Sequence, residues 1–325
     1  MKSFEYAAPK SLKEAVALLS DTWGRTEILA GGTDLVTSLK QRVTRPARVV
    51  SLRNIKELKG IKAGRGGLAI GATTTLAELV DNKDARKNFP SLVAAVEGIG
   101  SPQILSVGTV GGDLCQRPRC WYFRNGHGVL GRQGDTSLVR EGDNRYHAIF
   151  GNDGPALFVS PSSLGPALVA LGAQMTLTGP GAKTRTLAAA EFFRAPKSEN
   201  ERETALKPNE ILTEIFVPSK GLKNATYEVR HRHGFDWPYV TATVAFVMKG
   251  GAVSDARVVL GHVAPVPWNV AGAAGALNNS AVSETAAARC GEAAAEGAKP
   301  LSGNAYKVQM VKAAVKRAVL AAVAA

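Results

Sequence analysis

Cysteine is scarce in this chain, with 3 residues among 325. Cys115 and Cys120 lie close together, whereas Cys290 lies far along the chain in an alanine-rich stretch. Three cysteines exclude a disulfide-built scaffold, and the spacing of the first two differs from the Cys-x2-Cys pairs of zinc knuckles. His127 and His147 follow them, so a metal site of two cysteines and two histidines stays open as an alternative. We expect all three thiols to be buried and unreactive.

Long apolar runs are also missing. No stretch reaches the roughly 20 apolar residues of a membrane-spanning helix, and the apolar tract 311–325 is interrupted by Lys312, Lys316 and Arg317. This excludes a protein that crosses a membrane by apolar helices. The hydrophobic fraction of 45% and the charged fraction of 21% are typical of a globular protein, and 325 residues suffice for two domains with separate cores.

Acidic residues are outnumbered, since 27 Asp and Glu face 40 Lys and Arg and the net charge is +13. The basic residues are scattered, without the block of about five or six cations or the aromatic motif typical of nucleic-acid binding. Their densest groups, at 40–48 and 117–124, adjoin glycine-rich motifs. We therefore expect the basic surface to meet an anionic ligand and acidic protein partners, and no nucleic acid.

Glycine, by contrast, is abundant, with 34 residues. Two glycine pairs follow short apolar runs, in Ala30-Gly31-Gly32-Thr33-Asp34 and in Gly108-Thr109-Val110-Gly111-Gly112-Asp113. Other pairs, Gly66-Gly67 and Gly250-Gly251, are typical of ordinary turns.

The two glycine motifs together indicate a dinucleotide site. A glycine pair permits φ > 0 and lets the backbone approach a bulky ligand because there is no Cβ. The neighbouring Thr and Asp side chains add polar partners, and successive free N–H groups suit a phosphate or pyrophosphate. Neither motif is the G-x-G-x-x-G fingerprint, so a Rossmann domain is not supported.

Helices and strands alternate in short units, a pattern typical of α+β layers. Capping boxes at 11–14 and 75–78 predict two helix starts, the first helix reaching residue 19. Further helices are expected at 91–97 and 161–171, and strands at 26–29, 48–52, 67–71 and 174–178.

A domain boundary is expected near 180–187, where glycine and proline interrupt the pattern. The charged segment 197–207 is predicted to be a loop. Three strands then follow at 211–217, 239–248 and 252–263, the last two joined as a hairpin across Lys249-Gly250-Gly251. Two alanine-rich helices come last, at 283–296 and 305–323.

Six motifs occur in the order and spacing of a known protein family. They are Phe4-Glu5-Tyr6-Ala7-Ala8-Pro9, Leu29-Ala30-Gly31-Gly32-Thr33-Asp34-Leu35, Ile70-Gly71-Ala72-Thr73-Thr74-Thr75-Leu76, Gly108-Thr109-Val110-Gly111-Gly112-Asp113-Leu114, Pro208-Asn209-Glu210-Ile211-Leu212 and Ala264-Pro265-Val266-Pro267-Trp268. Through them the chain resembles, over nearly its whole length, the FAD-binding medium subunit of the molybdenum hydroxylases. This family includes xanthine dehydrogenase, carbon monoxide dehydrogenase and bacterial aldehyde oxidoreductases.

The resemblance implies an α+β fold in two parts. Residues 1–182 would form a PCMH-type FAD-binding domain, with subdomains at about 1–56 and 57–182 and an insertion at about 115–152. Residues 183–325 would form a domain like the C-terminal domain of the carbon monoxide dehydrogenase flavoprotein, a three-stranded antiparallel sheet with helices.

One segment resembles the periplasmic aldehyde oxidoreductase type of this subunit most, namely Gln116-Arg117-Pro118-Arg119-Cys120-Trp121-Tyr122-Phe123-Arg124. In those relatives the segment opens an insertion that holds a [4Fe–4S] cluster on four cysteines. Such a cluster takes four thiolates, and this chain has 3 cysteines in all. We therefore predict that the insertion is present and the [4Fe–4S] cluster is absent.

The resemblance also implies where FAD is held. The expected contacts on the glycine motifs are Leu29, Ala30, Gly31, Gly32, Thr33, Asp34 and Leu35, then Gly108, Thr109, Gly111, Gly112 and Asp113. Later contacts are Ser163, Leu164, Glu228 and Arg230. Ser163 stands where the family usually has the Asp of a Ser-Asp-Leu segment, and Glu228 where it often has a Lys beside the flavin. We expect non-covalent FAD, because the first motif contains no His or Cys, and we assign no catalytic or metal-binding residue.

The segment Arg230-His231-Arg232-His233-Gly234-Phe235-Asp236-Trp237-Pro238-Tyr239 is rich in cations and aromatic rings. The resemblance places it near the isoalloxazine ring, where cations would stabilise reduced, anionic flavin. The alternative is that its aromatic residues belong to the core of the C-terminal sheet and that its histidines lie on the surface.

The resemblance implies an electron-transfer oxidoreductase subunit. A molybdopterin-binding large subunit would oxidise the substrate, and [2Fe–2S] clusters of a small subunit would pass the electrons to this FAD and on to an external acceptor. The alternatives are a self-contained flavin-dependent oxidoreductase and a flavin-free assembly module, the latter suggested by Ser163 and Glu228. Because Met1-Lys2-Ser3-Phe4-Glu5 leads directly into family-like sequence, we expect no signal peptide and a cytoplasmic protein. Periplasmic export in folded form, with a partner that carries a twin-arginine signal, is the alternative.

Overall fold

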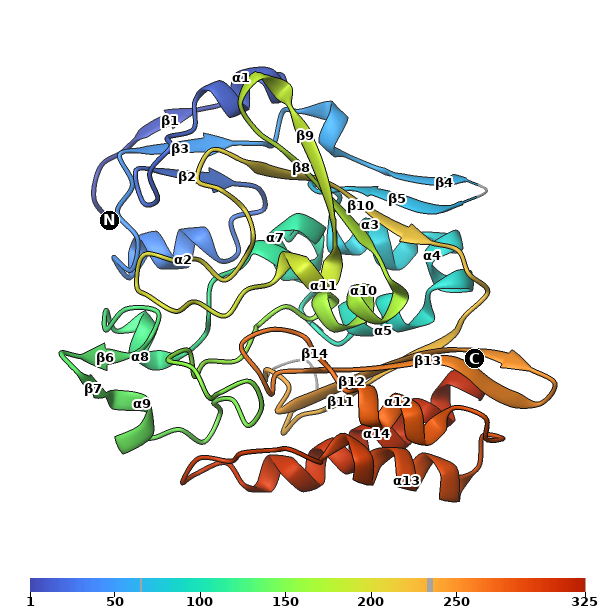
Figure 1. Ribbon diagram of the computed structural model, residues 1–325. Coiled ribbons are helices and arrows are strands. Elements are labelled where there is room, and N and C mark those ends of the chain that lie inside the picture. The colour runs from blue at the N-terminus through green and yellow to red at the C-terminus, as the bar shows by residue number, and fades with distance from the viewer. Residues whose placement is uncertain (65, 233–235, 325) are drawn as a thin grey trace.

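The computed structural model describes residues 1–64, 66–232 and 236–324 (Figure 1). Three main sheets and the helices around them form α+β layers, which confirms the expected fold class. The first two sheets occupy the upper half of Figure 1, and the third lies below them with the C-terminal helices.

The first sheet is parallel and three-stranded, in the order β1 (Glu5–Ala7), β3 (Arg48–Ser51), β2 (Thr26–Leu29). The helices α1 (Leu12–Ala17) and α2 (Leu35–Lys40) connect its strands. The Ser11 hydroxyl accepts a hydrogen bond from the Glu14 amide and so starts α1 as predicted. The helix ends at Ala17, two residues earlier than expected.

The second sheet is antiparallel and five-stranded. Its order is β4 (Ile61–Gly64), β5 (Gly67–Gly71), β10 (Ile211–Pro218), β8 (Gln174–Thr178), β9 (Thr184–Ala188). The sequence pattern assigned 211–217 to the C-terminal sheet, and this is wrong: β10 lies between β5 and β8. The reason is burial, because Leu212, Ile215 and Val217 belong to the core of this part of the chain. The expected boundary at 182–183 would cut the sheet, since β9 and β10 lie beyond it.

Short helices surround this sheet, and one of them, α7, contains most of the second glycine motif. They are α3 (Leu76–Asp81), α4 (Lys83–Asn88), α5 (Pro90–Glu97), α6 (Pro102–Val107), α7 (Val110–Cys115), α10 (Leu164–Leu171) and α11 (Ala189–Phe192), with 3-10 turns at Lys56–Leu58 and Pro180–Ala182. The predicted capping box of α3 is complete, because Thr75 and Glu78 each accept a hydrogen bond from the other's amide.

The expected insertion is present as a turn-rich segment at the left of Figure 1. It contains α8 (Trp121–Arg124), β6 (Arg132–Gln133), β7 (Thr136–Ser137) and α9 (Leu138–Glu141). Phe123, Val129 and Leu130 form a small apolar cluster with Ala156 and Phe158, so the segment has a core of its own.

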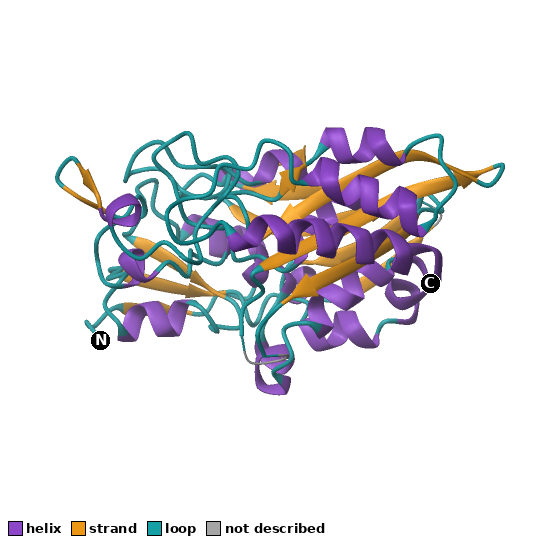
Figure 2. Cartoon of the chain, turned by 90° about the horizontal axis from the view of Figure 1, so that it is seen from below, coloured by secondary structure: helices purple, strands orange, loops and turns teal. Residues whose placement is uncertain are grey.

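The C-terminal sheet is antiparallel, in the order β11 (Lys223–Val229), β12 (Val240–Lys249), β13 (Ala252–Gly261), β14 (Trp268–Asn269). The predicted hairpin is β12–β13, and β11 takes the place that we expected for 211–217. The helices α12 (Ala271–Leu277), α13 (Glu284–Ala294) and α14 (Tyr306–Ala324) cover one face (Figure 2). The buried helix α10 contacts β12 and β13 and joins this sheet to the middle one.

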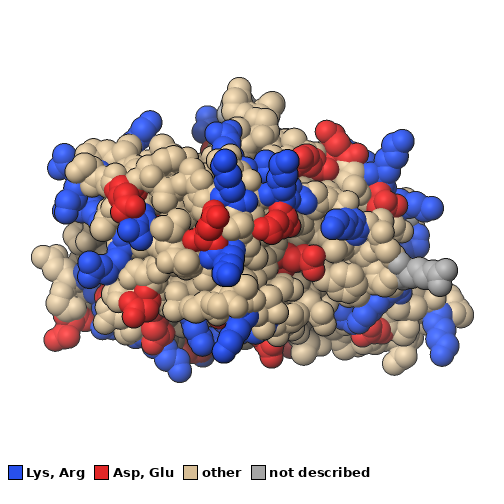
Figure 3. All heavy atoms as spheres, turned by 90° about the horizontal axis from the view of Figure 1, so that it is seen from above, with Lys and Arg blue, Asp and Glu red and all other residues tan. Residues whose placement is uncertain are grey.

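Figure 3 shows the upper face of the molecule, where basic and acidic side chains are interspersed without one large field of either sign. Such a surface does not have the continuous basic stripe of a nucleic-acid binding face. None of the helices in the described ranges combines the length and the apolar character needed to cross a bilayer.

Candidate functional site

A cavity of about 460 Å³ lies where the two glycine motifs meet. Its volume is within the range of small-molecule and cofactor pockets. Nine of the expected contacts line it: Ala30, Gly31, Gly32, Thr33, Asp34, Leu35, Thr109, Gly111 and Gly112. The others, Leu29, Gly108, Asp113, Ser163, Leu164, Glu228 and Arg230, are not among its lining residues.

The first glycine motif forms the turn between β2 and α2. A Cβ at Gly31 would lie 1.9 Å from the carbonyl oxygen of Val107, so only glycine fits against the end of α6. Gly32 has φ +80°, the positive angle expected at this glycine pair. The two motifs are therefore in direct backbone contact and form one wall.

The second glycine motif is not the positive-φ turn that we expected. Gly111 and Gly112 lie in α7, which begins after Thr109, whose hydroxyl accepts a hydrogen bond from the Gly112 amide at 3.1 Å. Because this cap starts a helix at once, the backbone adopts helical angles. A Cβ at Gly111 would lie 2.9 Å from the Ala72 oxygen, so the close approach at this glycine is to the protein's own backbone, whereas we expected it toward a ligand.

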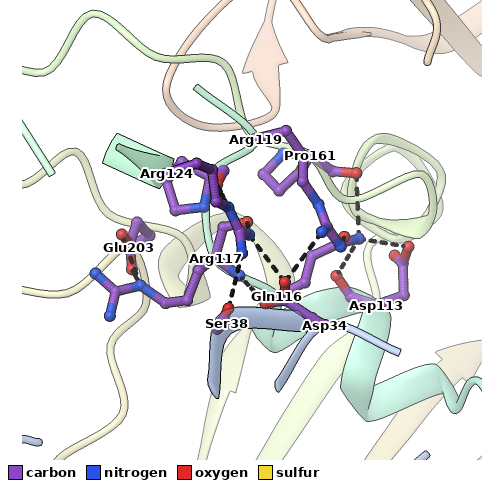
Figure 4. Close-up of polar contacts among 10 residues, drawn as sticks. Asp34, Ser38, Asp113, Gln116, Arg117, Arg119, Arg124, Pro161 and Glu203 are labelled. Atoms are coloured by element: carbon purple, nitrogen blue, oxygen red, sulfur yellow. Dashed lines mark hydrogen bonds and ion pairs between the residues drawn. The ribbon is translucent and has the colours of Figure 1, made fainter. Parts of the chain in front are cut away.

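Asp34, in the first glycine motif, binds the segment that opens the insertion (Figure 4). Its Oδ2 accepts a hydrogen bond from the Arg117 amide at 2.8 Å. Its Oδ1 lies 2.8 Å from Nη2 of Arg124 and 3.0 Å from Nη1 of Arg119. Arg124 also donates to the Ser38 hydroxyl at 2.7 Å. Both carboxylate oxygens thus hold the segment that opens the insertion, a role that the sequence hinted at only through its basic density.

Asp113 organises the buried side of the second motif. Its carboxylate accepts hydrogen bonds from the Ser162 hydroxyl at 2.6 Å, the Leu164 amide at 3.0 Å and the Ser163 amide at 3.3 Å. Burial raises the pKa of Asp113, and these hydrogen bonds oppose that shift. The carboxylate therefore positions the start of α10 beside α7.

Glu228 and Arg230 form a buried ion pair at the end of β11. Arg230 also donates to the carbonyl oxygen of Gly98, at the end of α5. Burial raises the pKa of Glu228 to about 7, although Arg230 opposes this shift. Its second carboxylate oxygen, Oε1, is buried and has no hydrogen-bond partner in the described part of the chain.

The aromatic segment after Arg230 divides between surface and core. His233 and Phe235 lie outside the described residues. Trp237 is 47% exposed, with the guanidinium of Arg119 5.1 Å from its ring centre, so it is not a core residue. Tyr239 packs at the edge of the C-terminal core, as the alternative expected. His231 lies on the surface, 3.8 Å from Asp236.

The segment 193–210, between α11 and β10, lines another side of the cavity, and we call it the strap. Arg202 lies 3.5 Å from Glu27 and 4.8 Å from the centre of the Trp23 ring. Glu203 pairs with Arg117 at 3.0 Å. Burial raises the pKa values of Glu27 and Glu203. The sequence predicted a charged loop here but did not show that it reaches the cavity, because its contacts lie far away along the chain.

Within the strap, Glu199 reaches the insertion. Its carboxylate oxygens accept hydrogen bonds from the amides of Val129 at 2.6 Å and Leu130 at 3.1 Å. The strap therefore contacts the insertion as well as the wall of the cavity.

The cysteines are free thiols, and only Cys290 is buried; Cys115 and Cys120 are half-buried, so the expectation that all three are buried holds for one of them. Burial raises the pKa of Cys115 and of Cys290 to about 12, so both stay protonated, as expected of unreactive thiols. Cys120 lies 3.1 Å from Nε2 of His147, whose pKa is lowered to about 4 by burial and by the charge of Lys307. In the ranges that the structure describes, no three His, Cys, Asp or Glu side chains are grouped to hold a metal ion. The absence of a [4Fe–4S] cluster stays a prediction.

Comparison with known proteins agrees with this geometry. Residues 2–220 match the family described as the FAD binding domain in molybdopterin dehydrogenase, and residues 225–322 match the CO dehydrogenase flavoprotein C-terminal domain. The carbon monoxide dehydrogenase medium chain of Hydrogenophaga pseudoflava is 32% identical over 324 residues, covering 98% of this chain and 96% of the relative. The FAD-binding subunit of an Escherichia coli aldehyde oxidoreductase is 28% identical over 284 residues, covering 86% and 88%. We expected a particular likeness to aldehyde oxidoreductases, but the carbon monoxide dehydrogenase medium chain is at least as similar to this chain.

Solved structures give the same result. The carbon monoxide dehydrogenase of Hydrogenophaga pseudoflava that lacks the Mo-pyranopterin moiety of its cofactor contains a chain with a TM-score of 0.76 and 30% identity, covering 99% of this chain and 97% of that chain. Quinoline 2-oxidoreductase from Pseudomonas putida 86 contains one with a TM-score of 0.77 and 26% identity, covering 99% and 98%. The glycine-walled cavity, the family matches and these structures together show that the chain belongs to the FAD-binding flavoprotein subunits of molybdenum-containing dehydrogenases.

Proposed function

We propose that this subunit carries electrons from [2Fe–2S] clusters of a small subunit, through its FAD, to an external acceptor. The observation that carries the proposal is that both glycine motifs line one and the same cavity. Substrate oxidation would take place in a molybdopterin-binding large subunit. Support for such partners comes from the relatives named as medium chains of carbon monoxide dehydrogenase.

The residues of the cavity fit a dinucleotide. Gly31 and Gly111 let the glycine motifs pack closely, because a Cβ at Gly31 would strike Val107 and a Cβ at Gly111 would strike Ala72, and this packing builds the wall beside which a dinucleotide would lie. Arg45, Arg117 and Arg202 also line the cavity and bring positive charge to an anionic pyrophosphate. When bound, FAD supplies the redox chemistry, because no ordinary side chain can accept and release electrons in this way.

Non-covalent attachment is part of the proposal, supported by the absence of His and Cys from Ala30-Gly31-Gly32-Thr33-Asp34. We further propose that Ser163, Leu164, Glu228 and Arg230 face the flavin end of FAD. Asp113 supports this assignment by tying Ser163 and Leu164 to the second motif, and its charge contributes to the raised pKa of Glu228. We expect assembly in the cytoplasm, with folded export beside a twin-arginine partner as the alternative.

A visible absorption spectrum of the purified chain tests the proposal. We expect the paired near-ultraviolet and blue bands of oxidised flavin, and release of FAD on denaturation. A colourless chain would favour the flavin-free assembly module. Turnover of an organic substrate by the purified chain alone would favour the self-contained oxidoreductase.

A further inference from the structure

Part of the cavity wall comes from the insertion, although the expected FAD contacts all lie outside it. Phe123, Gly128 and Val129 line the cavity beside the two glycine motifs. Phe123 and Val129 are buried and pack against Val43, which follows α2 and lines the cavity as well. The insertion therefore bounds the proposed FAD site from one side.

A carboxylate of the strap binds the insertion at this wall. Gly128 has φ +71°, and after it the successive amides of Val129 and Leu130 donate to Glu199 at 2.6 Å and 3.1 Å. Successive N–H groups beside a left-handed residue are a typical binding place for an anionic group. A Cβ at Gly128 would collide with the Glu199 carboxylate. Glycine at this position therefore provides both the backbone angle and the space that the contact needs.

The strap contacts the surroundings of the cavity at two more places. Glu203 pairs with Arg117 at 3.0 Å, and the guanidinium carbon of Arg117 lies 4.8 Å from the centre of the Phe123 ring. Through this pair the strap helps to fix an aromatic ring that lines the cavity. Arg202 reaches Glu27 on β2 at 3.5 Å, so the strap extends from the first sheet to the insertion.

The contact of Glu199 lies at the rim of the cavity. Glu199 lines the cavity and is also exposed to solvent, whereas Phe123 and Val129 are buried. In Figure 1 the strap runs from α11 toward α2 and the insertion. A ligand in the cavity is therefore enclosed by a bridge between segments that are 70 residues apart along the chain.

We propose that the strap and the insertion form a clasp that retains FAD and opens at Glu199 when the cofactor enters or leaves. The inference rests on the proposed function, and it gives the insertion a role in cofactor binding that needs no metal cluster. Two hydrogen bonds to a carboxylate have to break before the clasp opens, and hydrogen bonds to charged groups are stronger than those between neutral groups. The clasp should therefore act mainly on the rate at which FAD dissociates.

The experiment uses the full chain loaded with FAD and measures FAD release after dilution by the fluorescence of the free cofactor. Glu199→Ala removes the carboxylate of the clasp, and Gly128→Ala displaces it. Glu201→Ala is the control within the strap, because its carboxylate binds the Lys197 amide of the strap itself at 2.8 Å. Gly126→Ala is the control within the insertion: it has φ +91°, but a Cβ there would meet no described atom within 4 Å.

We expect Glu199→Ala and Gly128→Ala to release FAD about tenfold faster than the wild type, and both controls to stay within about twofold. The double variant Glu199→Ala/Gly128→Ala should be no faster than the single variants, because both substitutions remove the same contact. In the wild type, hydrogen exchange at the amides of Val129 and Leu130 should slow when FAD is bound. This last comparison tests the clasp even if the variants fold poorly.

Other outcomes separate the clasp from the proposed function. Release rates in Glu199→Ala and Gly128→Ala that match the wild type would overturn the clasp and leave the proposed function standing. Equal acceleration in Gly126→Ala and Gly128→Ala would show that backbone strain in the insertion, and not the contact with Glu199, controls release, which also overturns the clasp. A wild-type chain that binds no FAD would remove the proposed function, and the clasp with it.

Discussion

Gly31 and Gly32 are adjacent in the chain but are required for different physical reasons. At Gly31 the limit is space, because the Val107 carbonyl oxygen occupies the position next to a Cβ. At Gly32 the limit is the backbone angle of φ +80°, which L-residues with side chains rarely adopt. A glycine pair in the sequence therefore combines two separate constraints.

We expect Gly31→Ala to lose most of its FAD and to be destabilised by about 1–3 kcal/mol, as forced overpacking usually is. Gly275→Ala is the matched control, because no atom lies within 4 Å of a Cβ there. Because Gly275 lies in a helix, its replacement by Ala should raise the free energy of unfolding by about 0.5–1 kcal/mol. Flavin absorbance and thermal unfolding measure both effects. Full FAD content in Gly31→Ala would contradict the contact between the two motifs.

Glu228 should make stability depend on pH. Its pKa is raised by burial from 4.5 to about 7, so between these values the folded state holds a proton that the unfolded state has released. Its contribution to the free energy of unfolding is therefore fully present below about pH 4.5 and is lost as the pH rises to about 7. The size of the effect is about 3 kcal/mol.

Glu228→Gln should flatten this part of the pH profile, whereas Arg230→Met should steepen it by removing the partner that opposes the shift. Glu292→Gln is the control, since this exposed carboxylate pairs with Lys312 at the surface. Urea unfolding at about pH 5 and about pH 8 measures the difference. Equal slopes in the wild type and in Glu228→Gln would show that Glu228 does not titrate in this range.

Among the elements, the insertion is held from two sides. On one side Asp34, ahead of α2, binds Arg117, Arg119 and Arg124. On the other side α14 reaches it through Lys307, which is 1% exposed. These polar contacts fix the segment in which we predict no [4Fe–4S] cluster.

Asp34→Ala should release the start of the insertion, because three arginines then lose a partly buried anion. We expect a loss of about 2–4 kcal/mol and faster amide hydrogen exchange over 117–132. Asp143→Ala is the control within the same insertion: its pair with Arg145 is exposed to solvent and should contribute little to stability. Unchanged exchange in Asp34→Ala would mean that the strap and Lys307 hold the insertion without Asp34.

Lys307 should stabilise the fold through hydrogen bonds to three carbonyl groups. Its ammonium donates to the carbonyl oxygens of Tyr146 at 3.0 Å, His147 at 3.1 Å and His262 at 2.9 Å. Lys307→Met leaves buried acceptors without this donor, and we expect a loss of about 2–4 kcal/mol. Lys316→Met, at an exposed pair with Glu284, should change stability by about 0.5 kcal/mol or less.

Lys307 should also make the stability of the protein depend on pH. Burial lowers the pKa of Lys307 from 10.5 to about 7, so above pH 7 the unfolded state binds the proton more tightly than the folded state. Wild-type stability should therefore rise relative to Lys307→Met as the pH increases from about 7 to 10. Denaturant unfolding across this range measures the difference, and parallel curves for the two proteins would contradict the lowered pKa of Lys307.

For the whole molecule, FAD should couple the parts that line the cavity. The two glycine motifs, the segment after α7 and the strap come from distant parts of the chain, and a ligand that binds only the folded state stabilises all of them together. At a free concentration about 100 times its dissociation constant, FAD should add about 2.7 kcal/mol. Thermal unfolding of the flavin-free chain measures the shift.

Riboflavin is the control, because it has the ring system but no pyrophosphate for the glycine wall and the cavity arginines. We expect it to stabilise the chain much less than FAD does. An equal shift with both compounds would mean that the pyrophosphate is not held where we place it.

The sequence by itself determined the features that depend on neighbouring residues. The capping residues Ser11 and Thr75 begin helices as predicted, since a side chain and the amides it binds lie within one turn. The strand at 174–178 and the β12–β13 hairpin also follow from local alternation and turn residues. The glycine motifs located the cavity wall because bare backbone is a local property.

Only the tertiary structure decided the features that depend on distant partners. The strand at 211–217 joined the middle sheet because β5 and β8 offered it a buried place, which no local pattern reveals. Asp34 became an anchor for arginines more than 80 residues away, and Lys307 became buried because carbonyl groups of the insertion and of His262 surround its ammonium. Burial and pairing free energies belong to contacts between segments, so residues of the same type can act as ligand, anchor or solvated surface according to what folds against them.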